Sequence, residues 1–520
     1  MTEAQSRRWR VELLAAVLLA AALRALAAPA PRASAPWSSR DFAGLDSFVT
    51  SAMRERGVPG LQIAVIRGDR VVHLRAFGRA DPSGRTVTVR TPFRIGSNTK
   101  GFTALAIMQL AERGRLELGA PVQRYLPWFG VADSAASARI TVADLLYHTS
   151  GIPGSANYDS FLDPALTLEQ YVRALRSVRL ARPVGSAFEY SNANYNVLGL
   201  VVQAVSGESY GGYVRSHILA PLGMTHTTTS AEEERRQGLA QGYNWWFGVL
   251  RPARDPFSAA NLPAGYLSST AEDLSHYLIA QMNGGRYGAT SVLSPAGIAA
   301  MHAPGPHTHR PGQSATPAGY GMGWAVGANR GVPVFGHDGA TWSFHSLQMV
   351  DSRDGWGLIV LANADNQVTA FEPHRAITRG AFARLAGLPP PPTGPSLRVF
   401  YVVLDAVLLV ASAWIVWGLL RVPRWSAALR RRQRARHGRW RTAGTLARVA
   451  LEVLVPALLL VASPRLAGAS WRVLLVTAPD LGWWALAASA LLLATGLLHG
   501  ALLVRARSAG GDTVRPFARA

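Results

Sequence analysis

The stretch Phe-Arg-Ile-Gly-Ser-Asn-Thr-Lys at residues 93–100 places Ser97 and Lys100 three positions apart. A helical pattern starts at Asn98 and ends at Gly114, so we expect both side chains on one face of the first turn. A serine at a helix N-terminus also keeps its own backbone N–H free to bind an oxyanion. The stretch is therefore a candidate nucleophilic site at a loop-to-helix junction.

Lys100 is the only lysine of the chain, and the other 52 of its 53 basic residues are arginines. Serine is a weak nucleophile and needs a base. Arginine cannot be that base because its pKa stays above about 12, whereas a buried lysine can lose its proton near neutral pH. We therefore predict Ser97 as the nucleophile and Lys100 as its base. An ordinary exposed helix lysine is the competing interpretation.

Two later segments carry groups that can complete such a site. Residues 183–192 end in Tyr190-Ser191-Asn192, where the tyrosine can pass a proton to a leaving group and the asparagine amide can hold a substrate carbonyl. Residues 335–340, Phe-Gly-His-Asp-Gly-Ala, are typical of a strand whose glycines allow close backbone approach. His337 within it can bind substrate or tune the site. Taken singly, each segment is better explained by a structural role: a turn with a core tyrosine for the first, and a structural histidine for the second.

Together the three segments resemble the serine β-lactamase and penicillin-binding-protein superfamily, most closely the class C β-lactamase-like serine hydrolases. The chain has Ser97-x-x-Lys100 and Tyr190-x-Asn192, with His337-x-Gly339 where those β-lactamases carry Lys-Thr-Gly. The likeness covers roughly residues 41–385, and other stretches that share it are 145–152, 221–224, 264–269 and 320–324. It implies an α+β fold of the β-lactamase/transpeptidase type: an antiparallel sheet flanked by helices, a helical subdomain, and a cleft between them.

The resemblance also implies roles for single residues. Ser97 would be acylated, with Lys100 and Tyr190 as acid–base partners, and Asn192 would orient the substrate. The backbone N–H groups of Ser97 and Ala340 would form the oxyanion hole, and the substrate-binding strand would contribute His337, Gly339 and Ala340. No metal ion and no organic cofactor is implied.

The departure from Lys-Thr-Gly bears on the substrate. In the family pattern these residues attract a substrate carboxylate, but here they are His337 and Asp338. A like charge at ~4 Å in an effective dielectric near 20 costs about 4 kcal/mol. If Asp338 faces the cleft, we expect a membrane-anchored, exported hydrolase of an ester, an amide or a D-amino-acid peptide. The alternatives are a β-lactamase, a D-alanyl-D-alanine carboxypeptidase, a slowly acylated cell-wall or β-lactam sensor, or a degenerate scaffold.

Most of the net charge of +22 lies outside this domain. Residues 421–448 hold ten arginines and no acidic residue, and residues 505–520 add a net +3, whereas residues 36–396 contribute only +6. Both basic segments border long apolar runs, and we predict three transmembrane helices, at about 399–420, 446–463 and 481–504. The positive-inside rule puts the basic loop and tail in the cytoplasm and the catalytic domain on the extracytoplasmic side of the cell membrane.

The remaining segments complete the predicted organisation. Residues 1–35 are typical of a signal peptide, with an uncleaved anchor as the alternative; residues 36–388 form the hydrolase domain and 389–396 a Pro-rich linker. The expected partners are a small-molecule or peptide substrate, such as a cell-wall fragment, and membrane lipids. We expect the arginine loop to contact anionic headgroups rather than nucleic acid, and the oligomeric state stays open. The absence of cysteine excludes disulfides and cysteine nucleophiles.

Local patterns predict several elements within the domain. Residues 61–67 and 71–77 are expected to form a hairpin, and residues 346–350 and 357–361 late strands. We expect a helix at 166–175, and another that runs through Leu278 and is capped by Ser269 with Glu272. Three histidines, His302, His307 and His309, are expected in a solvated loop.

Overall fold

The computed structural model describes residues 42–308, 319–365, 373–389, 391, 397–424, 439–467 and 470–511. The predicted signal segment, most of the Pro-rich linker, the centre of the arginine loop, the end of the tail and His309 lie outside these residues. The chain forms two compact units, one that contains the β-sheet and one that contains the C-terminal helices. Each unit is described by itself.

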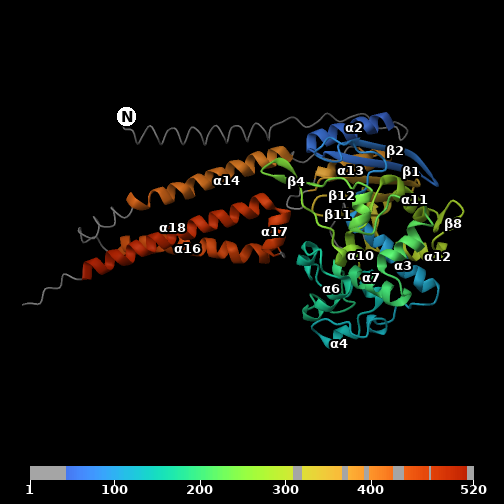
Figure 1. Cartoon of the computed structure of the whole chain (residues 1–520), viewed down its shortest axis with the longest axis horizontal. Helices are drawn as coiled ribbons and strands as arrows, with labels where there is room; N and C mark the ends of the chain where they lie inside the picture. Colours follow the sequence, from blue (N-terminus) through green and yellow to red (C-terminus); the bar gives the residue numbers. More distant parts are fainter. Residues whose placement is uncertain are drawn as a thin grey trace, which may run out of the picture. The chain divides into compact units, whose positions relative to one another are not determined.

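A seven-stranded antiparallel sheet organises the larger unit, in the order β2-β1-β13-β12-β11-β10-β9 (Figure 1). Its strands are β1 (Gly60–Arg67), β2 (Arg70–Gly78), β9 (Gly319–Tyr320), β10 (Ala325–Asn329), β11 (Val332–Ala340), β12 (His345–Asp351) and β13 (Trp356–Ala362). Short pairs add β3 (Phe93–Arg94) with β6 (Ser268–Ser269), β4 (Tyr243–Trp246) with β5 (Val249–Pro252), and β7 (Arg286–Tyr287) with β8 (Thr290–Ser291). The predicted hairpin and both late strands are confirmed.

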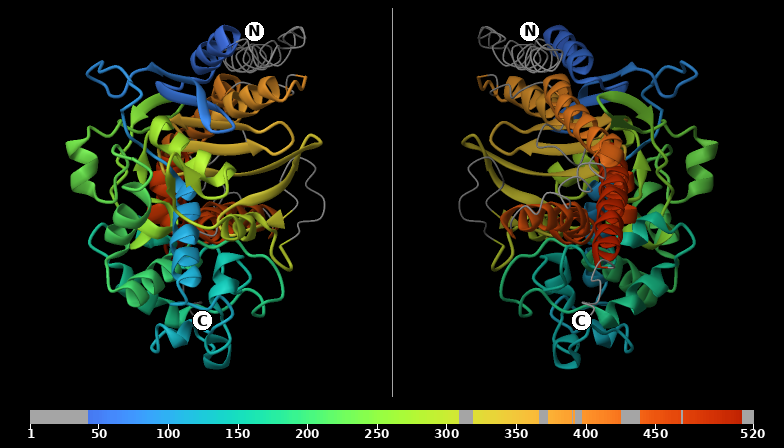
Figure 2. Two further views of the ribbon diagram at one scale, coloured as in Figure 1. Left: turned by 90° about the vertical axis from the view of Figure 1, so that its right-hand side faces the viewer. Right: turned by 90° about the vertical axis from the view of Figure 1, so that its left-hand side faces the viewer.

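The helices of this unit are α2 (Phe42–Arg56), α3 (Thr99–Glu112), α4 (Ser134–Ser137), α5 (Val142–Leu146), α6 (Leu168–Ala174), α7 (Asn192–Ser206), α8 (Tyr210–Val214), α9 (Ala231–Arg236), α10 (Leu262–Gly265), α11 (Ala271–Met282), α12 (Pro295–His302) and α13 (Pro373–Leu385). Helices α2 and α13 pack together on one face of the sheet, and α11 packs on the other (Figures 1 and 2). Helix α7 lies at the centre of a helical layer and contacts α3, α5, α6, α8 and α10.

Strand β1 shows why the sheet needs helices on both faces. Its residues alternate between two hydrophobic clusters: Ile63 and Val65 join the one with α2 and α13, and Ala64 and Ile66 join the one with α11. A strand buried on both faces is apolar at successive positions rather than at every second one. The edge strand β2, by contrast, is mostly exposed or half-buried. The predicted α+β fold with an antiparallel sheet and a helical subdomain is confirmed.

Two local predictions were wrong. Helix α11 is capped by Thr270, whose side chain accepts a hydrogen bond from Asp273 N at 3.1 Å, and not by Ser269. The Ser269 hydroxyl instead lies 2.7 Å from Thr227 Oγ1, because Ser269 still belongs to β6. His302 ends α12 rather than lying in a solvated loop, and its ring stacks on Phe335 with centroids 3.9 Å apart.

The C-terminal unit consists of α14 (Leu397–Leu420), α16 (Arg439–Ala467), α17 (Trp471–Thr477) and α18 (Pro479–Gly511). Within them, Leu397–Leu420, Leu446–Leu466 and Pro479–Arg505 are long and apolar enough to cross a membrane. These stretches coincide with the three spans that the sequence predicts.

Helices α16 and α18 pack closely around one carboxylate. Glu452 of α16 accepts a hydrogen bond from Arg448 Nε at 2.9 Å and lies 2.6 Å from His499 Nδ1 of α18. A side chain at Gly496 would contact Val453, so the glycine allows the two backbones to approach. Glu452 therefore joins two helices, as an acidic residue in an apolar segment is expected to do.

The cap of α11 provides a stability test. Replacing Thr270 by Ala removes the acceptor for Asp273 N and is expected to lower the free energy of unfolding by about 1 kcal/mol. Replacing Thr270 by Ser retains a hydroxyl and is expected to restore most of that stability. Denaturant unfolding of the purified chain measures both, and equal losses in the two variants would contradict this assignment of the cap.

Candidate active site

The Ser97 turn lies directly against the end of β11. Ser97 belongs to a 3₁₀ turn, Gly96–Asn98, that leads into α3. Gly96 has φ +49°, and a Cβ there would lie 2.5 Å from Ala340 N; a Cβ on Gly339 would lie 1.9 Å from Ile95 O. Only glycine fits at both positions, so this pair allows the Ser97 turn and the end of β11 to lie in direct backbone contact.

A buried hydroxyl reinforces this contact. Ser346 of β12 donates a hydrogen bond to Ile95 O at 2.6 Å, and its oxygen accepts one from Asn98 Nδ2, also at 2.6 Å. Both Asn98 and Ser346 are almost completely buried. The backbone on each side of Ser97 is therefore fixed to the central sheet.

Lys100 is completely buried and its amine makes three contacts. Nζ lies 3.0 Å from Ser97 Oγ, 2.7 Å from Asn192 Oδ1 and 2.7 Å from Ala264 O. Burial lowers the Lys100 pKa well below its ordinary value of 10.5, and among the described residues no carboxylate forms an ion pair with it.

The three contacts can be made by the three N–H groups of an ammonium, or by the two N–H groups and the lone pair of the neutral amine that a lowered pKa favours. A neutral lysine has two N–H donors and one lone pair. Asn192 Oδ1 and Ala264 O can only accept, so they take the two protons and leave the lone pair toward the Ser97 hydroxyl. The side chain is thereby oriented as a base for Ser97.

Tyr190 precedes α7 and lies beside both residues. Burial raises its pKa above the ordinary value of 10.0, although a hydrogen bond with the Ser97 side chain acts in the opposite direction. Lys100 Nζ lies 4.9 Å from the centroid of the Tyr190 ring. Tyr190 is therefore a neutral phenol at neutral pH, a proton donor rather than a tyrosinate base.

His337 also lies in this group, but as an uncharged ring. Its Nδ1 donates to the backbone carbonyl of Asp338, which leaves Nε2 to accept from Tyr320 Oη at 3.1 Å. Burial is the largest cause that lowers its pKa. The Asp338 side chain is exposed, and its charge contributes to the raised pKa of Tyr190. The β11 strand thus offers a neutral imidazole and a carboxylate where the family pattern has a cation.

A small pocket of about 50 Å³ opens beside the nucleophile. It is lined by Ser97, Tyr158, Phe161, Asn192, Ala264, Gly265, Tyr266, Ala340, Thr341 and Trp342. Three of the predicted site residues, Ser97, Asn192 and Ala340, are among them, and none of the lining side chains is charged. Lys100, Tyr190, His337 and Gly339 are not part of this lining.

Sequence reasoning missed one residue that shapes the site. His148 has φ +58° and is fully buried, and its Nδ1 accepts hydrogen bonds from Ser191 N at 3.2 Å and Asn194 Nδ2 at 3.0 Å. Its ring lies 4.5 Å from the Tyr190 ring. His148 therefore holds the turn that carries Tyr190. The segment 145–152 is part of the family resemblance, but nothing in its pattern indicates this contact.

A family model described as Beta-lactamase matches residues 45–381. The chain belongs to the β-lactamase family. The Ser97 turn, Lys100 and the Tyr190–Asn192 turn all lie within the matched region, as does the complete seven-stranded sheet.

Relatives extend this assignment. Protein flp of Staphylococcus aureus (strain MRSA252) is 29% identical over 326 residues, which cover 62% of this chain and 63% of that protein. The chain thus spans less than two thirds of the length of that relative. The octameric penicillin-binding protein homologue from Pyrococcus abyssi has 30% identity and a TM-score of 0.58 over 71% of this chain and 81% of that chain. A D-stereospecific amidohydrolase from Streptomyces sp. has 25% identity and a TM-score of 0.52 over 62% of this chain and 94% of that chain. The β-lactamase-type fold is common to all of them, in a family whose members are generally serine hydrolases.

The lowered pKa of Lys100 predicts a characteristic pH dependence. Because burial lowers the Lys100 pKa, labelling of Ser97 by a fluorophosphonate is expected to reach its plateau rate at a pH well below the ordinary lysine pKa of 10.5. The rate is expected to fall only as the pH drops through the lowered Lys100 pKa. Labelling rates between about pH 5 and about pH 10 measure the pH at which the rate falls. Tyr190→Phe serves as a control, because it is expected to leave that pH unchanged. A rate that rises steadily up to about pH 10 would indicate an ordinary lysine.

Proposed function

We propose that the protein is a serine hydrolase that forms an acyl-enzyme on Ser97. The observation that carries the proposal is the contact of 3.0 Å between Lys100 Nζ and Ser97 Oγ, made by an amine whose pKa is lowered by burial. A nucleophile with an oriented base at hydrogen-bond distance is the arrangement that acyl transfer requires.

The proposed reaction has two steps. Ser97 Oγ bonds to the substrate carbonyl carbon while its proton passes to Lys100, and the Ser97 and Ala340 N–H groups receive the oxyanion. The leaving group departs with that proton, returned by Lys100 through the Tyr190 phenol. A water molecule then attacks the carbonyl carbon of the acyl-enzyme ester and gives a proton to Lys100. The bond to Ser97 Oγ breaks, and Ser97 takes that proton back from Lys100.

The charge distribution favours a substrate without a carboxylate near the reacting carbonyl. The pocket lining is uncharged, His337 is neutral, and Asp338 is the charged group on the adjacent strand. We therefore favour esters, amides or amine-bearing D-amino-acid peptides. The similar Streptomyces protein, a D-stereospecific amidohydrolase, belongs to this range of activities.

The second candidate is activity on a β-lactam or a D-alanyl-D-alanine terminus, with turnover or with slow acylation alone. The similarity to the penicillin-binding protein homologue from Pyrococcus abyssi favours it. Under either candidate, the three apolar helices would hold the enzyme in the cell membrane, and the distribution of arginines supports an extracytoplasmic site.

Substitution of the two central residues tests the mechanism. Ser97→Ala is expected to lower p-nitrophenyl ester turnover by at least about 10³-fold and to abolish fluorophosphonate labelling. Lys100→Arg keeps the charge and loses the basicity, so a loss of at least about 10²-fold is expected. Wild-type turnover by Lys100→Arg would refute the role of the lysine.

A matched pair of substrates tests the preference against carboxylates. We expect a depsipeptide methyl ester to be hydrolysed about 10- to 100-fold faster than the same compound with a free carboxylate, since about 1.4 kcal/mol corresponds to a factor of ten. The double variant His337→Lys with Asp338→Thr is expected to reduce or reverse this preference. Faster turnover of the free acid, or of a β-lactam, by the unaltered protein would favour the second candidate.

A further inference from the structure

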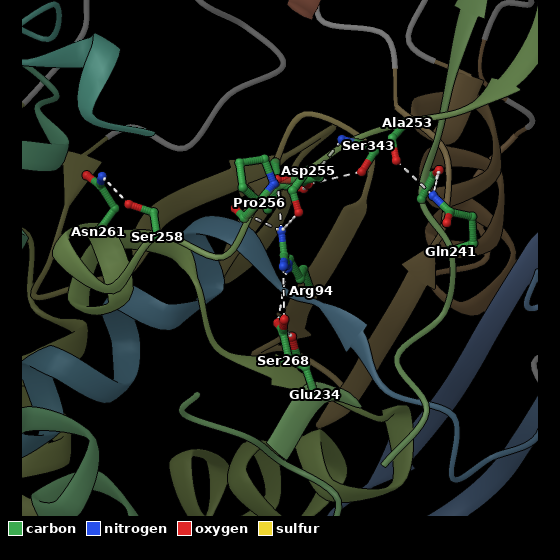
Figure 3. A network of polar contacts seen from close by, with 12 residues as sticks. Arg94, Glu234, Gln241, Ala253, Asp255, Pro256, Ser258, Asn261, Ser268 and Ser343 are labelled. Atoms are coloured by element: carbon green, nitrogen blue, oxygen red, sulfur yellow. Dashed lines mark hydrogen bonds and ion pairs between the residues drawn. The ribbon is translucent and has the colours of Figure 1, made fainter. Parts of the chain in front are cut away.

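A buried ionic network lies directly upstream of the nucleophile (Figure 3). Arg94 is three positions before Ser97, and its Nε and Nη2 donate to the two carboxylate oxygens of Glu234 at 3.0 and 2.9 Å. Its Nη1 lies 2.8 Å from Asp255 Oδ1 and donates to Asp255 O at 2.7 Å. All three side chains are only 4% exposed. One guanidinium thus binds two buried carboxylates.

The other oxygen of Asp255 binds the segment that follows the oxyanion strand. Asp255 Oδ2 accepts hydrogen bonds from Thr341 Oγ1 at 2.8 Å and from Ser343 Oγ at 3.0 Å. Thr341 lines the pocket and follows Ala340 directly, whereas Ser343 is fully buried and is not part of the lining. Asp255 is therefore connected both to the strand that enters the Ser97 turn and to the residues beyond Ala340.

The same guanidinium also contacts another residue of the pocket lining. Its carbon lies 5.2 Å from the centroid of the Tyr266 ring, which lines the pocket. Glu234 in turn accepts a hydrogen bond from Ser268 Oγ of β6. The buried network of Arg94, Glu234 and Asp255 thus connects segments that are distant in sequence, close to Ser97.

Such a network is poorly explained by stability alone. Burying charged groups costs free energy, and apolar residues of similar volume often replace a buried ion pair without loss of stability. A buried group with two hydroxyl donors does, however, fix the geometry of the chain that carries those hydroxyls. Oxyanion donors need such fixing, because an error of about 1 Å can cost about 10²-fold in rate.

We propose that Asp255 is a positioning residue for catalysis, which holds Ala340 and the pocket wall in register with Ser97 through Thr341, Ser343 and Arg94. It acts without touching the substrate or the reacting atoms. The proposal rests on the acyl-enzyme function proposed above.

The test separates positioning from folding. Asp255→Asn and Ser343→Ala are made in the full chain, and fluorophosphonate labelling gives both the number of labelled sites and the labelling rate of each site. Asp255→Asn is expected to lower the rate per labelled site and kcat by about 10²-fold, with KM nearly unchanged. A merely structural role would lower the number of labelled sites and leave the rate of each site as in the unaltered protein.

A matched control is available on the same sheet. Asp351 is a buried carboxylate that contacts Arg353, and it pairs with Val334 at the end of the β11–β12 ladder opposite to Ala340. Asp351→Asn is therefore expected to reduce stability without changing the rate per labelled site. A rate loss in Asp351→Asn equal to that in Asp255→Asn would overturn the proposal.

A double-mutant cycle identifies the path of the effect. Ser343→Ala alone is expected to lower the rate per labelled site several-fold, and to have no further effect in the Asp255→Asn background. Wild-type rates per labelled site in both single variants would overturn the proposal and leave the hydrolase function standing. If Asp255→Asn does not fold, the rate per labelled site of Ser343→Ala decides alone. If the unaltered protein neither labels at Ser97 nor hydrolyses esters, the proposed function fails first and the positioning role fails with it.

Discussion

The removal of the Lys100 amine from water, with no carboxylate among the described residues in ion-pair contact with it, is the constraint on which the site depends. Burial penalises the charged form of an amine in that position and so lowers its pKa, which favours loss of the proton. The surrounding structure then has to supply two acceptors and one acidic hydroxyl at the correct distances. Asn192 comes from the start of α7 and Ala264 from α10, so helices far apart in the sequence must meet at α3. The packing of the helical layer around α7 is what brings these acceptors to the lysine and so supports its proposed role as a base.

The central sheet supplies the other half of the site, and two glycines set how close it approaches. Without side chains at Gly96 and Gly339, the Ser97 turn can rest on the backbone of β11. Any Cβ at either position would separate the nucleophile from Ala340, the residue expected to donate to the oxyanion. The register of β11 with β12 then matters as well, because Ser346 opposite Gly339 hydrogen bonds to the carbonyl of Ile95. Close backbone contact at the two glycines, together with the Ser346 hydroxyl, determines the geometry here.

Local and periodic features of this chain could be predicted from its sequence. Ser97 and Lys100 are neighbours because helical geometry brings positions three apart together, and long apolar runs indicate helices by length alone. Arg94 pairs with Glu234 across 140 positions, and no period or motif encodes such a contact. The same holds for His148 and the Tyr190 turn. The error over the cap of α11 has a related cause: Ser269 and Thr270 are equally good caps in isolation, and only the pairing of Ser269 within β6 excludes it.

Arg94 and Lys100 are both buried, yet their pKa values shift in opposite directions. They stand six positions apart. Burial lowers the pKa of Arg94 as well, but Asp255 and Glu234 outweigh this effect and raise its pKa overall. Among the described residues, Lys100 hydrogen bonds to the neutral oxygen atoms of Ser97, Asn192 and Ala264, so burial prevails and its pKa falls. In a chain that otherwise uses arginine at every basic position, the one lysine stands where a cation able to lose its proton is useful. The fixed charge of Arg94 can organise structure, whereas the removable proton of Lys100 can take part in a reaction.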